Sequence, residues 1–360
     1  MNRRNFTKTT AAGLVGATLL GCASGKTTAL ISKKPTFINN LYYRANTWHF
    51  NPKHIAADMD WMADHGSHAI TIALSETDFS NAPRNIETIV RTAHDRGLKV
   101  LFVTSRWAGI FAGAPKAPSL FAAKNPQTWS LKADGKPYFH SSGPICSIYY
   151  PEVFEFFTSK LKEAFQRFDL DGVMWDEPKA YQLDFAPKGK AALSAEKVAA
   201  SPYDNPLDLH IANYCEYIST LNDVIKMEFP NKQIHFFAYP YLSEFFVEKA
   251  SEIRHLDYYG ADGRAYPKDQ RPATEKGKKY LLGEGATGFR YVEKAKEKGI
   301  KSMVLIENFR TILTEHPLLE KYLDDIIPNV DQFAYYYYPR SCETPDKTLE
   351  IITRKLKKYT

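Results

Sequence analysis

The side chains best suited to chemistry in this sequence are carboxylates that directly follow short apolar runs. In the segment DGVMWDEP, residues 171–178, an apolar run ends in the adjacent acids Asp176 and Glu177. Glu307 likewise follows the apolar run MVLI and precedes Asn308. A carboxyl group beside an apolar ring can keep its proton as a general acid, while a partner in a polar setting stays ionised. These acids predict a reaction carried by paired carboxyl groups.

Other catalytic chemistries lack their sequence patterns. The ten histidines are scattered, with no His-x-His at a strand end and no His-Glu-x-x-His motif. A Gly-x-Ser-x-Gly elbow is missing as well. We therefore expect no metal and no cofactor.

The elements that position the acids form a repeated strand and helix unit. Helical patterns end at Gly66, Gly97 and Gly299, and each is followed within a few residues by a β-rich apolar run. A glycine just after a helix can adopt the left-handed conformation that reverses the chain into a buried strand. This alternation is typical of an α/β fold with a parallel sheet.

Eight such strands can be counted. They are expected at residues 37–43, 68–74, 99–103, 171–176, 234–239, 255–259, 302–306 and 333–338. Eight parallel strands with intervening helices predict a single-domain (β/α)8 TIM barrel over residues 35–360. The alternative is a doubly wound open sheet, but residues 43–47 after the first strand offer no glycine-rich phosphate loop. Tyr280 to Leu282 could be a ninth strand, but this segment is interpreted as the start of the helix that ends at Gly299.

A closed barrel places its usable concavity where the loops leave the carboxyl ends of the strands. Neighbouring strand residues point to opposite faces, so Asp176 and Glu177 can both reach this cleft only at a turn. The substrate-binding candidates are the remaining polar and aromatic residues at predicted strand ends: Arg44, Trp48, His49, Arg106, Trp107, Trp175, Tyr239, Asp257, Tyr259, Asp262, Asn308, Tyr338 and Arg340. Aromatic rings there could stack on a ligand, and arginines, Arg264 included, could bind a carboxylate or sulfate group.

The ending of the fourth strand resembles that of retaining (β/α)8-barrel glycoside hydrolases. Trp175-Asp176-Glu177-Pro178 is similar to the Asn-Glu-Pro ending of the clan whose general acid/base Glu lies there. In that clan a nucleophilic Glu ends the seventh strand, where this chain has Glu307. The resemblance implies Glu177 as acid/base and Glu307 as nucleophile, although Asp176 stands where the clan usually has Asn.

The same segment, interpreted as Asp-Gly-x-x-x-Asp, also resembles α-glycosidase barrels with a nucleophilic Asp on the fourth strand. Under this second interpretation Asp176 attacks, and Asp257 or Asp262 near the sixth strand is the acid. Both assignments stay open, as do retention or inversion and the identity of the sugar.

The N-terminus predicts export. Arg-Arg-x-Phe-x-Lys at residues 3–8 resembles a twin-arginine signal, and Leu-Leu-Gly-Cys ending at Cys22 resembles a bacterial lipobox. We expect residues 1–22 to be an export signal with Cys22 lipidated, residues 23–34 to be a linker, and the protein to be anchored in the periplasm or at the cell surface. This lipid is the only expected membrane contact.

Composition excludes several other classes. The chain has 360 residues, of which 44% are hydrophobic and 24% charged, as in ordinary globular proteins. Removal of Arg3, Arg4 and Lys8 would lower the formal net charge from +6 to +3, and no basic run stands out, so nucleic acid is not an expected partner.

Two long segments complete the prediction. Residues 108–150 and 178–210 are too long for simple connections, and under the barrel fold they line the cleft. Trp129, His140 and Tyr149 could contribute contacts from the first. The sequence thus predicts a glycosidase that acts on an oligo- or polysaccharide. The alternative is a surface lipoprotein that binds glycans without turnover, in which Arg or Lys partners occupy the acids.

Overall fold

The computed structural model describes residues 36–42, 51–114, 116–267, 281–283, 285–337 and 341–359. Eight parallel strands close into one barrel: β1 (Phe37–Tyr42), β2 (Ala69–Leu74), β3 (Lys99–Thr104), β6 (Gly172–Asp176), β7 (Gln233–Ala238), β8 (Tyr258–Gly263), β9 (Lys301–Ile306) and β10 (Gln332–Tyr336). Neighbours follow the chain order, and β1 pairs with β10 to close the ring. The predicted TIM barrel is confirmed, and the open-sheet alternative is wrong.

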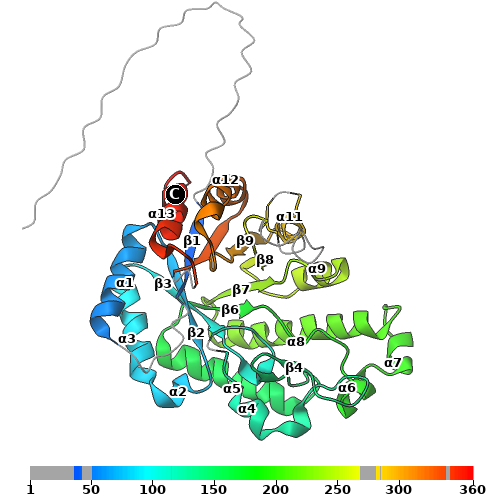
Figure 1. Cartoon of the computed structure of the whole chain (residues 1–360). Coiled ribbons are helices and arrows are strands. Elements are labelled where there is room, and N and C mark those ends of the chain that lie inside the picture. Colours follow the sequence, from blue (N-terminus) through cyan, green and yellow to red (C-terminus); the bar gives the residue numbers. More distant parts are fainter. Residues whose placement is uncertain are drawn as a thin grey trace, which may run out of the picture. The chain divides into compact units, whose positions relative to one another are not determined.

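Helices surround this barrel (Figure 1). Those of five or more residues are α1 (Pro52–Asp64), α3 (Pro83–His94), α4 (Leu120–Lys124), α5 (Pro151–Phe168), α6 (Pro187–Ala192), α7 (Ala195–Ala199), α8 (Pro206–Glu228), α9 (Glu244–Ser251), α11 (Phe289–Glu297), α12 (His316–Ile326) and α13 (Pro345–Leu356). The short α2 (Asp78–Asn81) precedes α3. Gly66, Gly97 and Gly299 have positive φ angles of 78°, 73° and 70°. The predicted left-handed glycine after α1, α3 and α11 is therefore confirmed.

Side chains of the barrel strands alternate between two apolar clusters. One fills the barrel interior and includes Leu101, Met174, Phe237 and Leu305. The other lies between the strands and the surrounding helices and includes Trp175. Because the two faces alternate, the last residue of a strand has its orientation fixed by the residues before it. Asp176 follows this rule and points into the barrel, on the same face as Met174.

The sixth strand of the barrel, β8, differs from its prediction. Residues 255–259 were expected to form it, whereas the structure has Tyr258–Gly263. Glycine and aspartate are poor strand formers, but here β7 and β9 pair with the segment on both sides. Gly260 is required by this packing, since a Cβ there would lie 1.8 Å from the carbonyl oxygen of Met303. The shift places Asp257 before the strand and Asp262 inside it.

The segment at Leu281 also differs from its prediction. Leu281 forms an isolated parallel bridge with Arg264, and the Leu282 N–H donates to the Arg264 carbonyl oxygen at 3.1 Å. Leu281 and Leu282 therefore extend the pairing of β8 instead of starting a helix, which begins only at Phe289. Tyr280 lies outside the described residues.

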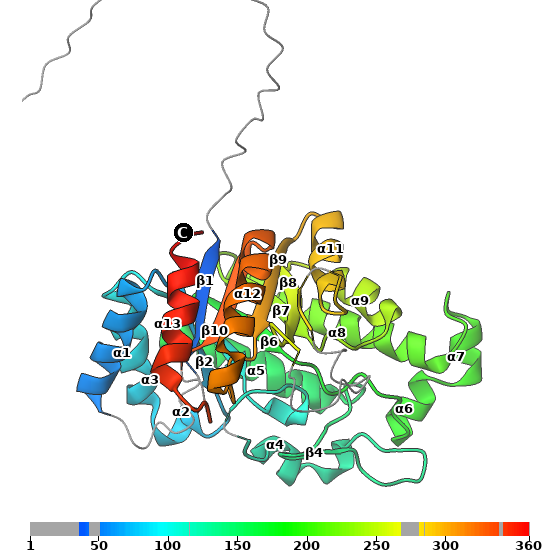
Figure 2. The same ribbon diagram turned by 45° about the horizontal axis from the view of Figure 1, so that its top comes forward.

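The two long segments leave the barrel after β3 and after β6. The first carries the 3-10 turns Trp107–Gly109 and Pro126–Thr128, helix α4 and the short strands β4 (Phe139–His140) and β5 (Gly143–Pro144). The second carries α6 and α7. Figure 2 shows α4, β4 and α6 on one side of the barrel. Both segments follow the carboxyl ends of strands, as the barrel fold predicts for segments that line a cleft.

The described residues belong to one compact unit. None of the helices within the described ranges is long and apolar enough to cross a membrane. Cys22 and the expected export signal and linker lie outside the described residues, so they stay predictions.

Candidate active site

Three carboxylates meet at the carboxyl ends of β6, β8 and β9. Glu177, Asp262 and Glu307 each place one oxygen within 4.8 Å of the others. We call these three residues the acid cluster. They come from three strands that the chain reaches in separate strand and helix units, so only closure of the barrel brings them together.

A backbone turn directs Glu177 into the cluster. Asp176 ends β6, and Glu177 then adopts a left-handed conformation with φ of 40°. The Glu177 N–H still donates to the Phe237 carbonyl oxygen at 3.2 Å, so the residue stays attached to β7. A positive φ in a residue other than glycine costs about 1–3 kcal/mol and persists where the surroundings enforce it. The turn allows two consecutive acids to reach the mouth of the barrel, as the sequence required.

Lys179 is the closest basic partner of Glu177. Its Nζ lies 2.8 Å from Glu177 Oε2, and the two side chains are only 4% and 12% exposed. The same Nζ donates a hydrogen bond to the Tyr239 hydroxyl and lies 4.0 Å from the centre of the Tyr239 ring. Sequence reasoning missed Lys179; its position two residues after Glu177, across a proline, was the available signal.

The pKa values of Glu177 and Asp262 are shifted in opposite directions. Burial raises the pKa of Asp262 well above its usual range, and the charges of Glu177 and Glu307 raise it further. Burial also acts to raise the pKa of Glu177, but the charge of Lys179 and hydrogen bonds from Asp262, Lys179 and Tyr239 outweigh it and lower that pKa. These opposite shifts favour Asp262 as the member of the pair that holds a proton.

Glu307 is the most accessible acid of the cluster. Its side chain is 16% exposed, and its carboxylate lies 3.6 Å from Arg264 Nε. The Glu307 N–H donates to the Gly263 carbonyl oxygen at 2.7 Å, which continues the pairing of β9 with β8. The carboxylate thus has a fixed backbone and a cation beside it.

Buried groups form the floor below the cluster. Asp176 is 4% exposed and Tyr336 is 8% exposed, and both point into the barrel. Burial raises the pKa of the Tyr336 hydroxyl well above its usual range, and Asp262, Asp176, Glu177 and Glu307 raise it further. The hydroxyl therefore keeps its proton at neutral pH, close to four acids.

His140 and Arg106 reach the site from the segment after β3. The Arg106 guanidinium contacts His140 Nδ1 at 3.2 Å, and its Nε donates to the Gly113 carbonyl oxygen at 3.0 Å. Burial lowers the pKa of His140 to about 4, and the nearby charges of Lys179 and Arg106 contribute to this shift. His140 is thus neutral at neutral pH. Of the three residues expected to contribute contacts from this segment, His140 reaches the site.

Trp129 and Tyr149 make internal contacts instead. The Trp129 indole N–H donates to the Ala122 carbonyl oxygen at 2.7 Å, and the Tyr149 hydroxyl contacts His210 Nδ1 at 2.8 Å. Both therefore stabilise the long segments, and their contact with substrate stays a prediction.

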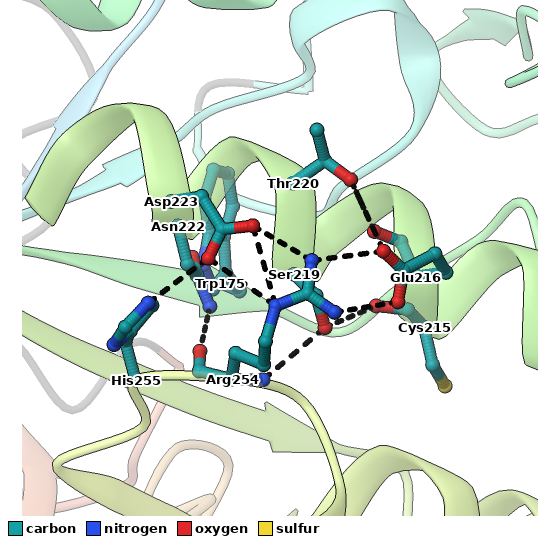
Figure 3. Close-up of polar contacts among 9 residues, drawn as sticks. All are labelled: Trp175, Cys215, Glu216, Ser219, Thr220, Asn222, Asp223, Arg254 and His255. Atoms are coloured by element: carbon teal, nitrogen blue, oxygen red, sulfur yellow. Dashed lines mark hydrogen bonds and ion pairs between the residues drawn. The ribbon is translucent and has the colours of Figure 1, made fainter. Parts of the chain in front are cut away.

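Trp175 was expected to line the cleft, and this is wrong. Its side chain is fully buried in the outer cluster, and its indole N–H donates to Asn222 Oδ1 of α8 at 2.9 Å. Figure 3 shows Trp175 directed toward α8, beside Asn222. Strand alternation explains the error, because Asp176 occupies the inward face and its neighbour Trp175 must point outward.

Trp107 and Tyr259 are also packing residues. The Trp107 indole N–H donates to the Leu74 carbonyl oxygen at 2.8 Å, and the Tyr259 hydroxyl donates to the Val247 carbonyl oxygen at 2.8 Å. Both side chains are fully buried in the outer cluster. Their predicted substrate contact is therefore wrong.

Asp257 lies at the opposite end of β8 from the acid cluster. It precedes the strand and accepts a hydrogen bond from the Ile234 N–H at 2.9 Å. Asn308 is 1% exposed and exchanges two hydrogen bonds with the Tyr336 backbone, which fixes β10. Neither residue is placed to bind substrate, so both predictions are wrong.

Five further candidates cannot be placed. Arg44, Trp48, His49, Tyr338 and Arg340 lie outside the described residues. Tyr239, Asp262 and Arg106 are the binding candidates that lie at or beside the cluster.

The acid cluster also has the donor set of a cation site, since three carboxylate oxygens converge within 4.8 Å. However, Lys179 and Arg264 already lie beside Glu177 and Glu307. The chain's own side chains thus compensate charge at two of the three acids, and we assign no metal to them.

Comparison with known proteins places the fold. No protein-family model matches this chain, and no curated protein matches it. In structure it is similar to the β-galactosidase from the psychrophilic Marinomonas ef1 (TM-score 0.60, 11% identity, 89% of this chain and 59% of that one). It is also similar to the catalytic domain of the β-amylase from Paenibacillus polymyxa (TM-score 0.54, 10% identity, 90% and 98%).

A third similar structure is the α-galactosidase from Lactobacillus brevis (TM-score 0.50, 14% identity, 91% of this chain and 40% of that one). The chain therefore spans less than two thirds of the length of each galactosidase, 59% of the β-galactosidase and 40% of the α-galactosidase. At these identities the likeness shows a shared barrel fold.

Proposed function

We propose that the protein is a glycoside hydrolase that uses the acid cluster. The observation that carries this proposal is the meeting of three carboxyl groups at the mouth of the barrel, two of which have pKa values shifted in opposite directions. Cleavage of a glycosidic bond needs one protonated and one ionised carboxyl group near the same bond. The barrel fold shared with known glycosidases supports the same reaction class.

The three acids take different roles in this proposal. Glu307 attacks the anomeric carbon while the bond from that carbon to the leaving oxygen breaks. The Glu177 and Asp262 pair donates its proton to the leaving oxygen. Water then attacks the same carbon, the pair takes up a proton from that water, and Glu307 leaves unchanged.

The spacing supports retention of configuration. Retaining enzymes hold their two carboxyl groups about 5–5.5 Å apart, whereas inverting enzymes need about 6.5–9.5 Å to admit a water molecule. One oxygen from each acid of the cluster lies within 4.8 Å of the other two, which brings the groups close enough for the retaining arrangement. We therefore propose a double displacement through a glycosyl ester on Glu307.

Two assignments from the sequence are modified. Glu177 was expected to be the acid/base alone, but the proton of the pair is held on Asp262. The second interpretation from the sequence, with Asp176 as nucleophile and Asp262 as acid, also places the proton on Asp262. Asp176 is 4% exposed, compared with 16% for the Glu307 side chain, so we favour Glu307 as the group that reaches substrate.

One observation favours the alternative of glycan binding without turnover. Glu177 and Lys179 form the buried ion pair that this alternative expects of an acid with no catalytic role. Under it, Glu177→Gln and Glu307→Gln would leave glycan binding unchanged, and no hydrolysis would be observed with any sugar.

The test is hydrolysis of a panel of 4-nitrophenyl α- and β-glycosides and of oligosaccharides. We expect one sugar class to be cleaved, and Glu307→Gln and Glu177→Gln to lower kcat/KM by about 10³-fold or more. Glu196→Gln, an exposed acid on α7, is the matched control and should be neutral. If no glycoside is hydrolysed and the variants bind glycans as well as the wild type does, the hydrolase proposal is refuted and glycan binding without turnover is supported.

A trapping experiment identifies the nucleophile. A 2-deoxy-2-fluoroglycosyl fluoride of the cleaved sugar forms a slowly hydrolysed ester with the attacking carboxylate. Mass spectrometry of the digested protein should find the label on the peptide that contains Glu307. A label on Asp176 would instead support the α-glycosidase-like assignment.

A further inference from the structure

A second concavity lies beside the acid cluster and has a different chemical character. It has a volume of about 490 Å³, which falls within the range of small-molecule sites. Its wall is mostly aromatic and aliphatic: Tyr138, Tyr181, Gln182, Leu183, Leu207, Ile211, Tyr241, Leu242, Ser243 and Phe246. We call it the tyrosine pocket. The segments after β3, β6 and β7 and the start of α8 all contribute to it.

The tyrosine pocket connects to the acid cluster through stacked rings. Tyr241 of the pocket stacks on Tyr239, with ring centres 5.0 Å apart and planes 22° from parallel. Tyr239 in turn lies under Lys179, which pairs with Glu177. The pocket therefore lies on the Glu177 side of the cluster.

The wall of the pocket is fixed by internal contacts. Tyr181 packs edge-on against Phe246, with ring centres 5.9 Å apart. The Tyr181 hydroxyl also makes hydrogen bonds with Gln182 and Tyr241. These contacts occupy polar groups that would otherwise face a ligand.

This lining suits an apolar ring better than a sugar. A sugar brings several hydroxyl groups, each of which needs a hydrogen-bond partner when it leaves water. The Ser243 hydroxyl is already engaged, since it caps α9 by accepting a hydrogen bond from the Phe246 N–H at 3.2 Å. The aromatic walls of the pocket can stack on a flat ring. Leu207 also lines the pocket, and its apolar side chain is 40% exposed to solvent, where a bound ring could cover it.

We propose that the tyrosine pocket binds an apolar, ring-containing leaving group of the glycoside substrate. The proposal rests on the proposed hydrolysis, in which the Glu177 and Asp262 pair protonates the leaving oxygen. Because the pocket lies on the Glu177 side, a group attached to that oxygen extends toward Tyr241. The substrate class is then a glycoside of an aryl or arylalkyl alcohol.

The test compares 2-phenylethyl glycosides with ethyl glycosides of the cleaved sugar. Both leaving alcohols have similar acidity, so the phenyl ring is the main difference between them. We expect kcat/KM to be about tenfold or more higher for the 2-phenylethyl glycoside. Leu207→Asn and Tyr138→Ser should each remove several-fold of this preference.

Leu120→Asn is the matched control, since Leu120 is 45% exposed but does not line the pocket. It should keep the full preference. Equal kcat/KM for both glycosides in the wild type, or a preference that survives both pocket variants, would overturn the pocket assignment while the hydrolase stands.

A binding measurement separates this proposal from the proposed function. Free 2-phenylethanol should shift the methyl NMR signals of Leu207 and Ile211 in the wild type, and should bind Tyr138→Ser more weakly. Such binding without hydrolysis of any glycoside would refute the hydrolase and keep the apolar site. No shift at either residue would refute the site.

Discussion

Two groups of acids meet basic partners at opposite ends of β8. At the carboxyl end the acid cluster meets Lys179 and Arg264. Before the amino end, Arg254 and His255 meet Glu216 and Asp223 of α8, which we call the Arg254 cluster (Figure 3). The Glu177 and Glu307 side chains are 12% and 16% exposed, whereas Glu216 and Asp223 are 62% and 40% exposed.

The difference shows that burial, more than ion pairing, decides whether the pKa of a carboxyl group is raised or lowered. In the Arg254 cluster, hydrogen bonds from Arg254 lower the pKa of Asp223, and solvent screens what remains. In the acid cluster, burial and crowding among like charges raise the pKa of Asp262. Only the second environment leaves a carboxylic acid protonated beside a carboxylate at neutral pH.

The largest expected effect comes from Asp262→Asn. The amide keeps the shape but cannot supply a proton, so kcat/KM should fall by about 10²–10⁴-fold. The raised pKa of Asp262 means that the wild type holds this proton at neutral pH and loses it as the pH rises. Wild-type activity should therefore decline on the alkaline side, and the residual activity of the variant should lack this decline.

The same substitution has a signature in stability. The folded protein binds the Asp262 proton more tightly than the unfolded chain, so this contribution to stability is lost as the pH rises. Asp262→Asn should flatten the alkaline fall of Tm. Asp223→Asn is the control in the Arg254 cluster and should leave the pH dependence of kcat/KM unchanged. If kcat/KM of Asp262→Asn still declines at alkaline pH as in the wild type, the proposed difference between the acid cluster and the Arg254 cluster is contradicted.

An intermediate effect is expected from Lys179→Met. Loss of the cation removes the main influence that lowers the pKa of Glu177 against its burial, so Glu177 should take up a proton near neutral pH. The optimum of the kcat/KM profile should then move to higher pH. Breaking a buried pair also destabilises folding by about 3–5 kcal/mol, which is measured by urea unfolding.

Lys179→Arg serves as the matched variant because it keeps the charge with a different geometry. It should hold the pH optimum near that of the wild type. If both variants shift the profile equally, the charge of Lys179 does not set the protonation of Glu177.

The smallest effect is expected in the Arg254 cluster. Glu216→Gln removes one exposed partner of Arg254, and such pairs contribute about 0–1 kcal/mol. The free energy of unfolding should change by no more than this, and the change should shrink at high salt. Activity should stay at the wild-type value. A loss above about 2 kcal/mol would show that exposure does not separate the two clusters.

Much of the fold could be predicted because periodicity and glycine position are local properties. The strand ends at Asp176 and Ile306 agree with expectation, and these two ends position Glu177 and Glu307. β8 was misplaced because its Gly-Ala-Asp-Gly ending lacks strand propensity and is held by its neighbours β7 and β9. That single displacement moved Asp257 from inside the strand to a position before it, and Asp262 from a position after the strand to one inside it.

The aromatic candidates failed for a related reason. Residue type does not reveal which face of a strand a side chain occupies at the barrel rim, and Trp175 and Tyr259 both point toward the helices. Lys179 was missed because a lysine beyond a proline resembles any loop cation until its 4% exposure is known.

By itself the sequence determined the number and order of the strand and helix units and the acids that end β6 and β9. These depend on hydrophobic period and chain reversal, which act over a few residues. The tertiary structure alone decided that Asp262 joins Glu177 and Glu307, which of them holds the proton, and which lysine balances the charge. Protonation depends on burial and on charges a few ångströms away, and only barrel closure brings those groups together.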